Sequence, residues 1–118
     1  MNVATQILVK AGNATLNSDF GLLMDARADL DGLYLHNIDN GEYDILVDLI
    51  EDMKLDIPDM NVATQILVKA SNATLNSDFG LLMDARADLD ELYPHNIDDD
   101  EYDILVDLIE DMKLIFNS

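Results

Sequence analysis

The chain contains nearly the same sequence twice, in residues 1–59 and again in residues 60–118. From residue 1 to 55 and from residue 60 to 114 the two copies differ at only five positions, whereas the last four residues of each copy are unrelated. Because both copies must fold with almost the same side chains, we expect two similar units related by a pseudo-twofold axis. The differing pairs are Gly12/Ser71, Gly32/Glu91, Leu35/Pro94, Asn40/Asp99 and Gly41/Asp100.

Each copy is short for an independent domain. A chain of about 60 residues buries only about 60% of the surface that it exposes when unfolded, and it often needs a partner, a metal or disulfides. The sequence contains no cysteine, which excludes disulfides and cysteine-ligated zinc. We therefore expect the copies to pack against each other as a single fused domain over residues 1–118, made of repeats 1–59 and 60–118 with a junction at residues 56–59.

Two helices are predicted in each copy from the spacing of apolar residues. In the first copy these residues recur every three or four positions over residues 20–34 and over residues 43–53. Ser18 is a typical N-cap residue for the first helix, and Asp39 with Glu42 forms a capping box before the second. The second copy repeats these features in residues 79–93 and 102–112, with Asp98 and Glu101 as the equivalent capping box.

Residues 2–11 are compatible with two kinds of secondary structure. Val3, Ile7 and Ala11 have helical spacing, but the alternation of side chains along the same segment fits a strand. The Gly12-Asn13 pair that follows suits a helix C-cap or a hairpin turn. The favoured fold is a mainly α, compact helical bundle. In the alternative, each unit is strand–helix–helix, and the two strands pair as a ribbon across the pseudo-twofold axis.

The expected core is shared by the two copies. Four aromatic residues, Phe20, Tyr34, Phe79 and Tyr93, are expected to join the aliphatic helix faces in this core. The five positions at which the copies differ are expected at helix ends or in loops, so that both copies can bury the same apolar face.

The charge of the chain is strongly negative and evenly distributed. It has 25 acidic and six basic residues, a net charge of −19, with 12 acids in the first copy and 13 in the second. Such a surface repels nucleic acids and anionic membranes and attracts basic proteins. No signal peptide is visible, and no apolar run approaches the roughly 20 residues of a membrane span. We expect a cytoplasmic protein that binds neither nucleic acid nor membrane.

Three aspartates in the second predicted helix of each copy lie four residues apart. This spacing places neighbouring carboxylates about 6 Å apart on one helix face, at a cost of about 0.2–0.5 kcal/mol for each like-charge pair. The pitch is comparable with that of phosphates along a DNA strand, so the stripe suits a basic protein surface and resembles a nucleic-acid mimic; the alternative is a solvated face. This acidic stripe comprises Asp44, Asp48, Asp52, Asp103, Asp107 and Asp111.

A second candidate site surrounds the two histidines of the sequence. Carboxylates bind Ca²⁺ and Mg²⁺, and histidine together with carboxylates binds transition metals. Helix capping explains two of the aspartates without a metal, so metal binding ranks third among the expected functions. The candidate ligands are His36, Asp39, His95, Asp98, Asp99 and Asp100.

The sequence shows no pattern typical of an enzyme. It has no cysteine nucleophile, no glycine-rich phosphate loop and no His-Glu-x-x-His pattern. We therefore expect neither catalysis nor a cofactor. The two leading functions are an acidic protein-interaction module that occupies a basic surface, and an engineered or recently duplicated single-chain tandem dimer without activity of its own.

Overall fold

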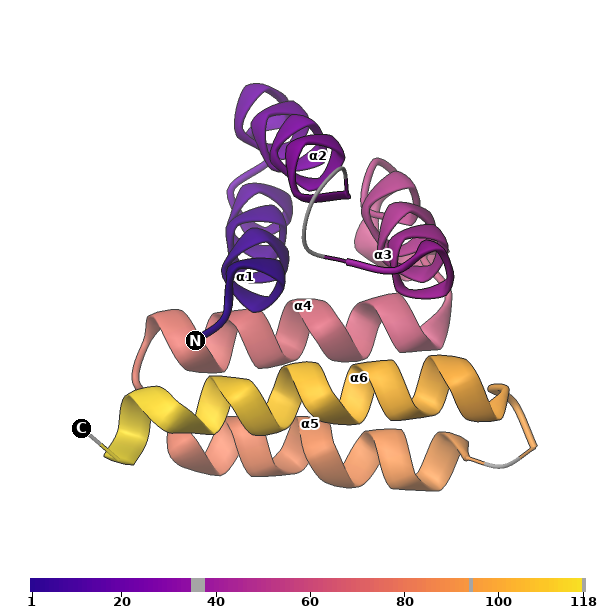
Figure 1. The fold of residues 1–118 in the computed structure, drawn as a ribbon. Coiled ribbons are helices and arrows are strands. Elements are labelled where there is room, and N and C mark those ends of the chain that lie inside the picture. Colours follow the sequence, from indigo (N-terminus) through magenta and orange to yellow (C-terminus); the bar gives the residue numbers. More distant parts are fainter. Residues whose placement is uncertain (35–37, 94, 118) are drawn as a thin grey trace.

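The computed structural model describes residues 1–34, 38–93 and 95–117, and each copy contributes three α-helices (Figure 1). These described residues contain no strand. Residues 3–16 form a helix, so the helical interpretation of the first segment is confirmed and the two-stranded ribbon is wrong. The elements are α1 (Val3–Leu16), α2 (Phe20–Tyr34), α3 (Asn40–Asp52), the 3₁₀ helix η1 (Ile57–Asp59), α4 (Val62–Leu75), α5 (Phe79–Leu92), α6 (Asp99–Met112) and the 3₁₀ helix η2 (Lys113–Asn117).

Helices α1 and α4 form the centre of the molecule, where they cross each other (Figure 1). Each also packs against the next helix of its own copy, α1 against α2 and α4 against α5. The radius of gyration is 13.1 Å, close to the value of about 13 Å typical of a compact domain of this length. None of the helices in the described part of the chain is long and apolar enough to cross a membrane. A single apolar cluster contains fully buried residues of both copies, among them Leu8, Leu30, Leu46, Leu67, Leu89 and Leu105.

The first helix of each copy is buried along its middle turns, whereas the apolar residues near its ends, Val3 and Leu16 in copy one, are exposed. Ile7, Leu8 and Ala11 are buried at helical spacing. Asn2 caps this helix, since its side-chain oxygen accepts a hydrogen bond from the backbone N–H of Thr5 at 3.0 Å. The equivalent bond caps α4 in the second copy. In a strand, the side chains of Ile7 and Leu8 would point to opposite faces.

Gly12 and Ser71 lie within the contact between α1 and α4. The Ser71 hydroxyl is fully buried and donates to the carbonyl oxygen of Leu67 at 2.9 Å in its own helix, with that of Leu8 3.4 Å away across the interface. A Cβ atom at position 12 would lie 2.4 Å from the Ser71 Cβ atom. The Gly12-Asn13 pair is therefore part of a helix interior, neither a C-cap nor a turn. The expectation that every differing position lies outside the core is wrong for this pair.

The turn between α1 and α2 uses Ser18 differently from the prediction. Ser18 has a φ of 53°, in the left-handed region, and its equivalent in copy two has a φ of 54°. Its N–H donates to the Thr15 oxygen at 3.3 Å, and the Asp19 N–H donates to the Ala14 oxygen at 2.9 Å, as in a Schellman motif. Asp19 is the residue that caps α2, because its carboxylate accepts from the Leu22 N–H at 3.0 Å. The prediction of Ser18 as the N-cap is therefore wrong.

Phe20 and Phe79 lie outside the core. Phe20 is 62% exposed and Phe79 is 49% exposed, because each stands at the start of its helix, before the first buried leucine. Tyr34 and Tyr93 are half-buried, and each ring packs on a tyrosine of the following helix with centroids about 4 Å apart. The expected contribution of the phenylalanines to the core is wrong, and the core is almost entirely aliphatic.

Candidate partner-binding surface

The acidic stripe on α3 has two exposed members and one that makes a structural contact. Asp44 and Asp48 are exposed, whereas Asp52 is half-buried at the end of the helix. The Asp52 carboxylate accepts a hydrogen bond from the backbone N–H of Asn61 at 2.9 Å. Because Asn61 caps α4, this bond joins the end of α3 in copy one to the start of α4 in copy two.

The stripe on α6 repeats this arrangement, and here the contact runs from copy two to copy one. Asp103 and Asp107 are exposed, and the carboxylate of Asp111 accepts from the backbone N–H of Asn2 at 2.7 Å. The last aspartate of each stripe thus holds the first helix of the other copy, near the positive end of the helix dipole. The other four aspartates of the stripe are exposed to solvent.

Two glutamates that were predicted only as helix caps are influenced by the negative charges of the other copy. The pKa of Glu42 is raised by partial burial and by the negative charges of Asp39 and Asp107. The pKa of its counterpart Glu101 is raised by burial and by the charges of Asp98 and Asp48. The middle aspartate of each stripe therefore interacts with a glutamate of the other copy. Sequence spacing could not reveal this pairing, because it depends on how the copies pack.

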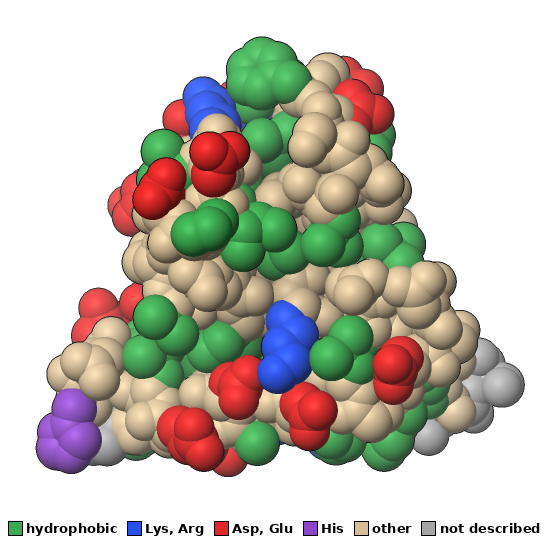
Figure 2. Space-filling model, turned by 180° about the vertical axis from the view of Figure 1, so that it is seen from behind, with side chains coloured by type: hydrophobic (Ala, Val, Ile, Leu, Met, Phe, Trp, Pro, Cys, Tyr) green, Lys and Arg blue, Asp and Glu red, His purple; other side chains and the backbone are tan. Residues whose placement is uncertain are grey.

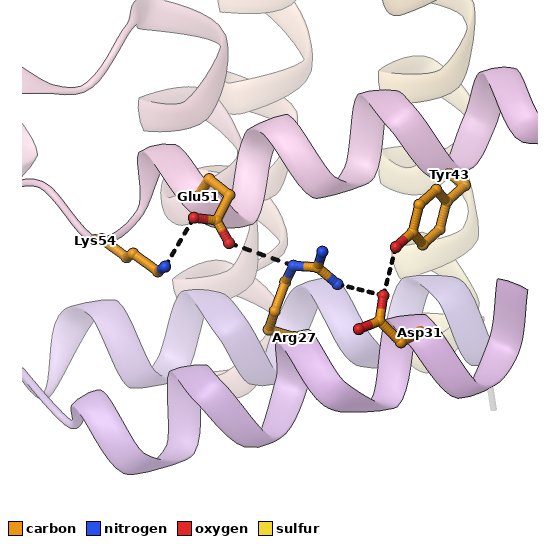
Figure 3. Close-up of polar contacts among 5 residues, drawn as sticks. All are labelled: Arg27, Asp31, Tyr43, Glu51 and Lys54. Carbon is orange, nitrogen blue, oxygen red and sulfur yellow. Dashed lines mark hydrogen bonds and ion pairs between the residues drawn. The ribbon is translucent and has the colours of Figure 1, made fainter.

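Arg27 links α2 to α3 through carboxylates on both sides of its guanidinium group (Figure 3). Its Nη1 atom lies 2.6 Å from Asp31, and its Nε atom lies 3.3 Å from Glu51 on α3. Asp31 also accepts a hydrogen bond from the Tyr43 hydroxyl, and Lys54 lies 2.7 Å from Glu51. Besides the two carboxylates, the network includes a tyrosine and a lysine, which the sequence pattern did not indicate.

The second copy contains the same network around Arg86. Arg86 lies 2.5 Å from Asp90 and 3.4 Å from Glu110, which also pairs with Lys113. The two remaining lysines, Lys10 and Lys69, bridge the first and second helices of their copies. All six lysines and arginines of the chain therefore lie in ion pairs. The excess negative charge belongs to carboxylates that have no lysine or arginine partner in the described part of the chain.

These ion pairs lower the pKa values of their carboxyl groups. The hydrogen bond from the Tyr43 hydroxyl and the one from Arg27 hold the pKa of Asp31 below its ordinary value. The pKa of Glu51 is lowered chiefly by the hydrogen bond from Lys54. The corresponding groups of copy two, Asp90 and Glu110, have lowered pKa values for the same reasons. These carboxylates stay ionised at neutral pH and are engaged by the fold.

The surface seen from behind in Figure 2 has acidic side chains distributed widely, with few basic ones between them. Hydrophobic side chains are also exposed on this face, in patches that separate the acidic groups. A partner of this face would therefore meet negative charge together with apolar area.

The candidate metal ligands are dispersed among other roles. The carboxylates of Asp39 and Asp98 cap α3 and α6, each accepting a backbone N–H at 2.8 Å. Asp99 and Asp100 are exposed in the first turn of α6, His95 is exposed in the preceding turn, and His36 lies outside the described residues. Within the described part of the chain, no group of three or more histidine, aspartate or glutamate side chains is placed to hold a metal ion.

No protein-family model matches this sequence, and searches of curated proteins and of solved structures returned no significant match. The charges, contacts and exposure of the surface residues therefore carry the functional proposal.

Proposed function

We propose that this protein is a non-enzymatic interaction module that uses its acidic surface to occupy a basic protein surface. The observation that carries the proposal is that all six cations are held in ion pairs while Asp44, Asp48, Asp103 and Asp107 stay exposed. An approaching cationic surface meets carboxylates that are not neutralised within the protein. Complementary charge of this kind accelerates encounter and makes binding sensitive to salt.

Nucleic-acid mimicry is the form of this function that the stripe suits best. Successive carboxylates on α3 and α6 stand about 6 Å apart, like phosphates along a strand. The charge of Asp48 acts on Glu101 and that of Asp107 acts on Glu42, so the acidic groups of the two copies influence one another. A protein that normally binds the DNA backbone through lysines and arginines would find a comparable array of charges.

The test is competition against DNA for a basic protein. A sequence-independent DNA-binding domain is mixed with labelled duplex DNA, and this protein is added as competitor at several salt concentrations. We expect displacement of the DNA that weakens as salt rises. A variant carrying Asp44→Lys, Asp48→Lys, Asp103→Lys and Asp107→Lys should compete at least about tenfold less well.

A matched control separates the stripe from net charge. The control variant carries Asp56→Lys, Asp59→Lys, Asp84→Lys and Glu91→Lys, which changes the net charge equally at exposed positions outside the stripe. It should retain most of the competition. Equal losses in the two variants, or no competition by the unaltered protein, would refute the proposal.

A second candidate function is favoured by the reciprocal contacts between the copies. We infer that the chain is a tandem single-chain dimer with a pseudo-twofold axis near Gly12 and Ser71, and with no activity of its own. The bond from Asn61 to Asp52 and the bond from Asn2 to Asp111 support this symmetry, because they join equivalent residues in opposite directions.

Light scattering coupled to size-exclusion chromatography tests the tandem-dimer proposal. Residues 1–59 alone should form a homodimer with the mass and size of the full chain, because glycine would face glycine near the axis. Residues 60–118 alone should associate more weakly, because serine would face serine where the interface accommodates one hydroxyl. A folded monomer of residues 1–59 would exclude the tandem-dimer interpretation.

A further inference from the structure

The C-terminal segment of copy two contacts an aromatic side chain of its own copy, Phe79, which stays 49% exposed. Residues Lys113–Asn117 form η2, which packs against α5. Within it, Phe116 lies edge-on to Phe79 with ring centroids 5.4 Å apart and an interplanar angle of 70°. This is a favourable geometry for two aromatic rings.

Copy one has the corresponding aromatic residue, Phe20, but no phenylalanine at the position that corresponds to Phe116. The duplicated sequence places Ile57 where copy two has Phe116. The chain turns after α3, and Ile57 begins η1, which leads into α4. Phe20, the counterpart of Phe79, is 62% exposed. Beside it lies a hollow of about 470 Å³, which Ile57 also lines. The rest of its apolar lining includes Leu16, Phe20, Leu23, Met53, Leu55 and Pro58.

The charges around this hollow favour a cationic occupant. Asp19 and Asp56 line it and are exposed. Lys54 is the only cation among its lining residues, and its ammonium group lies 2.7 Å from Glu51. A positively charged group that enters beside the Phe20 ring therefore meets the carboxylates of Asp19 and Asp56, since the ammonium group of Lys54 pairs with Glu51 instead.

We propose that the hollow at Phe20 is a docking site for a basic segment of a partner protein, which inserts a phenylalanine against Phe20 as Phe116 packs against Phe79. The contact between Phe116 and Phe79 in the other copy indicates an aromatic occupant. The carboxylates of Asp19 and Asp56 indicate that this occupant is positively charged. None of the residues that line the hollow belongs to the acidic stripe, so this site goes beyond the proposed charge-based interaction.

The probe is a peptide with the sequence of residues 113–118 preceded by two additional lysines. It is titrated into the ¹⁵N-labelled full chain, and amide chemical shifts are followed. We expect shifts centred on Leu16, Phe20 and Met53. A peptide with alanine in place of its phenylalanine should bind at least about tenfold more weakly, and so should one with glutamates in place of its lysines.

Variants of the protein locate the site. Phe20→Ala should abolish the shifts, whereas the control Phe79→Ala should retain them around position 20. Asp56→Lys should weaken binding, and the fourfold stripe variant should bind the peptide unchanged, which separates this site from the proposed stripe function. Phe20 is 62% exposed and Phe79 is 49% exposed, so we expect both alanine variants to fold. Thermal unfolding verifies this.

Three results would overturn the proposal. The first is the lack of any saturable shift with the unaltered peptide. The second is a set of shifts centred on Phe79, which would mean that the peptide displaces η2. The third is concentration-dependent self-association of the full chain that Phe20→Ala abolishes, which would make the C-terminal segment of a second copy the occupant.

Discussion

A Cβ atom at Gly12 would lie 2.4 Å from the Cβ atom of Ser71, a distance that folded proteins do not tolerate. The close approach of α1 and α4 thus depends on a residue without a side chain at one position and a small hydroxyl side chain at the other. The pair is one of five at which the copies differ in residues that otherwise repeat. The difference is therefore complementary across the interface.

Gly12→Ser should destabilise the protein by about 1–3 kcal/mol, because two serine side chains cannot share this space. Exchange of both residues, Gly12→Ser with Ser71→Gly, should recover much of this loss, since one side chain again faces a glycine. Urea unfolding of the two single variants and the double variant measures the coupling. The control is Gly32→Ala, which meets no atom within 4 Å and should stabilise by about 0.5–1 kcal/mol. Additive effects of the exchange would contradict this account.

Ser18→Gly should stabilise the protein by about 1 kcal/mol, and Ser77→Gly should do the same. Both serines occupy the left-handed region, which costs residues with a Cβ atom roughly 1–2 kcal/mol. The change in the free energy of unfolding is measured by urea or thermal denaturation. Ser18→Ala is the control, because it removes the hydroxyl without relieving the backbone and should bring no gain. An equal gain from alanine would point to the hydroxyl as the unfavourable group.

Asp52→Ala should cost about 1 kcal/mol, because it removes the acceptor for the Asn61 N–H at the start of α4. Asp48→Ala, on the same helix face, should leave stability unchanged or raise it slightly, since the exposed Asp48 carboxylate lies near Glu101. The free energies of unfolding of the two variants are compared at neutral pH and low salt. A larger loss at Asp48 than at Asp52 would reverse the assigned roles.

Glu42→Gln with Glu101→Gln should stabilise the protein at neutral pH. The pKa values of both groups are raised on folding above the ordinary value of 4.5, so the folded state favours their protonated forms. Their stabilising contribution is complete below about pH 4.5 and is lost as the pH rises through the raised values. The advantage of the glutamine variant should therefore disappear below that pH.

The lowered pKa values act in the opposite direction. Asp31 and Glu51, with Asp90 and Glu110, contribute stability above their unfolded pKa values and lose it as the pH falls through their folded ones. Unfolding of the unaltered protein and of the glutamine variant across the acidic range measures the two effects. A constant difference between the proteins at all pH values would contradict the assignment to Glu42 and Glu101.

Much of the local structure could be predicted from the sequence. The apolar spacing of α2 and α3 and the capping aspartates Asp39 and Asp98 were sufficient, because these signals are local. The left-handed conformation of Ser18 was not predictable from a residue type that more often caps a helix. The role of Gly12 depends on a side chain 59 positions away, and it emerges only when α1 and α4 meet.

The candidate site was predictable only in outline. The row of aspartates on α3 follows from helical spacing, and Asp44 and Asp48 are indeed exposed. The structural contact of Asp52 with Asn61 depends on the turn between the copies, which periodicity does not describe. The exposure of Phe20 was missed because an apolar residue at the start of a helix has the same spacing as one in the core.

The bond between Asn2 and Asp111 has a consequence for how the chain can be connected. The end of copy one is joined to the start of copy two covalently, through residues 56–59, and also by the bond between Asp52 and Asn61. The end of copy two is held beside the start of copy one by the equivalent bond between Asp111 and Asn2. A linker between residues 118 and 1, with an opening in the junction, would yield a circular permutant in which the second copy precedes the first. We expect the packing and the two asparagine–aspartate bonds to be retained while the helix order along the chain begins at α4, so that either copy can come first in the polypeptide.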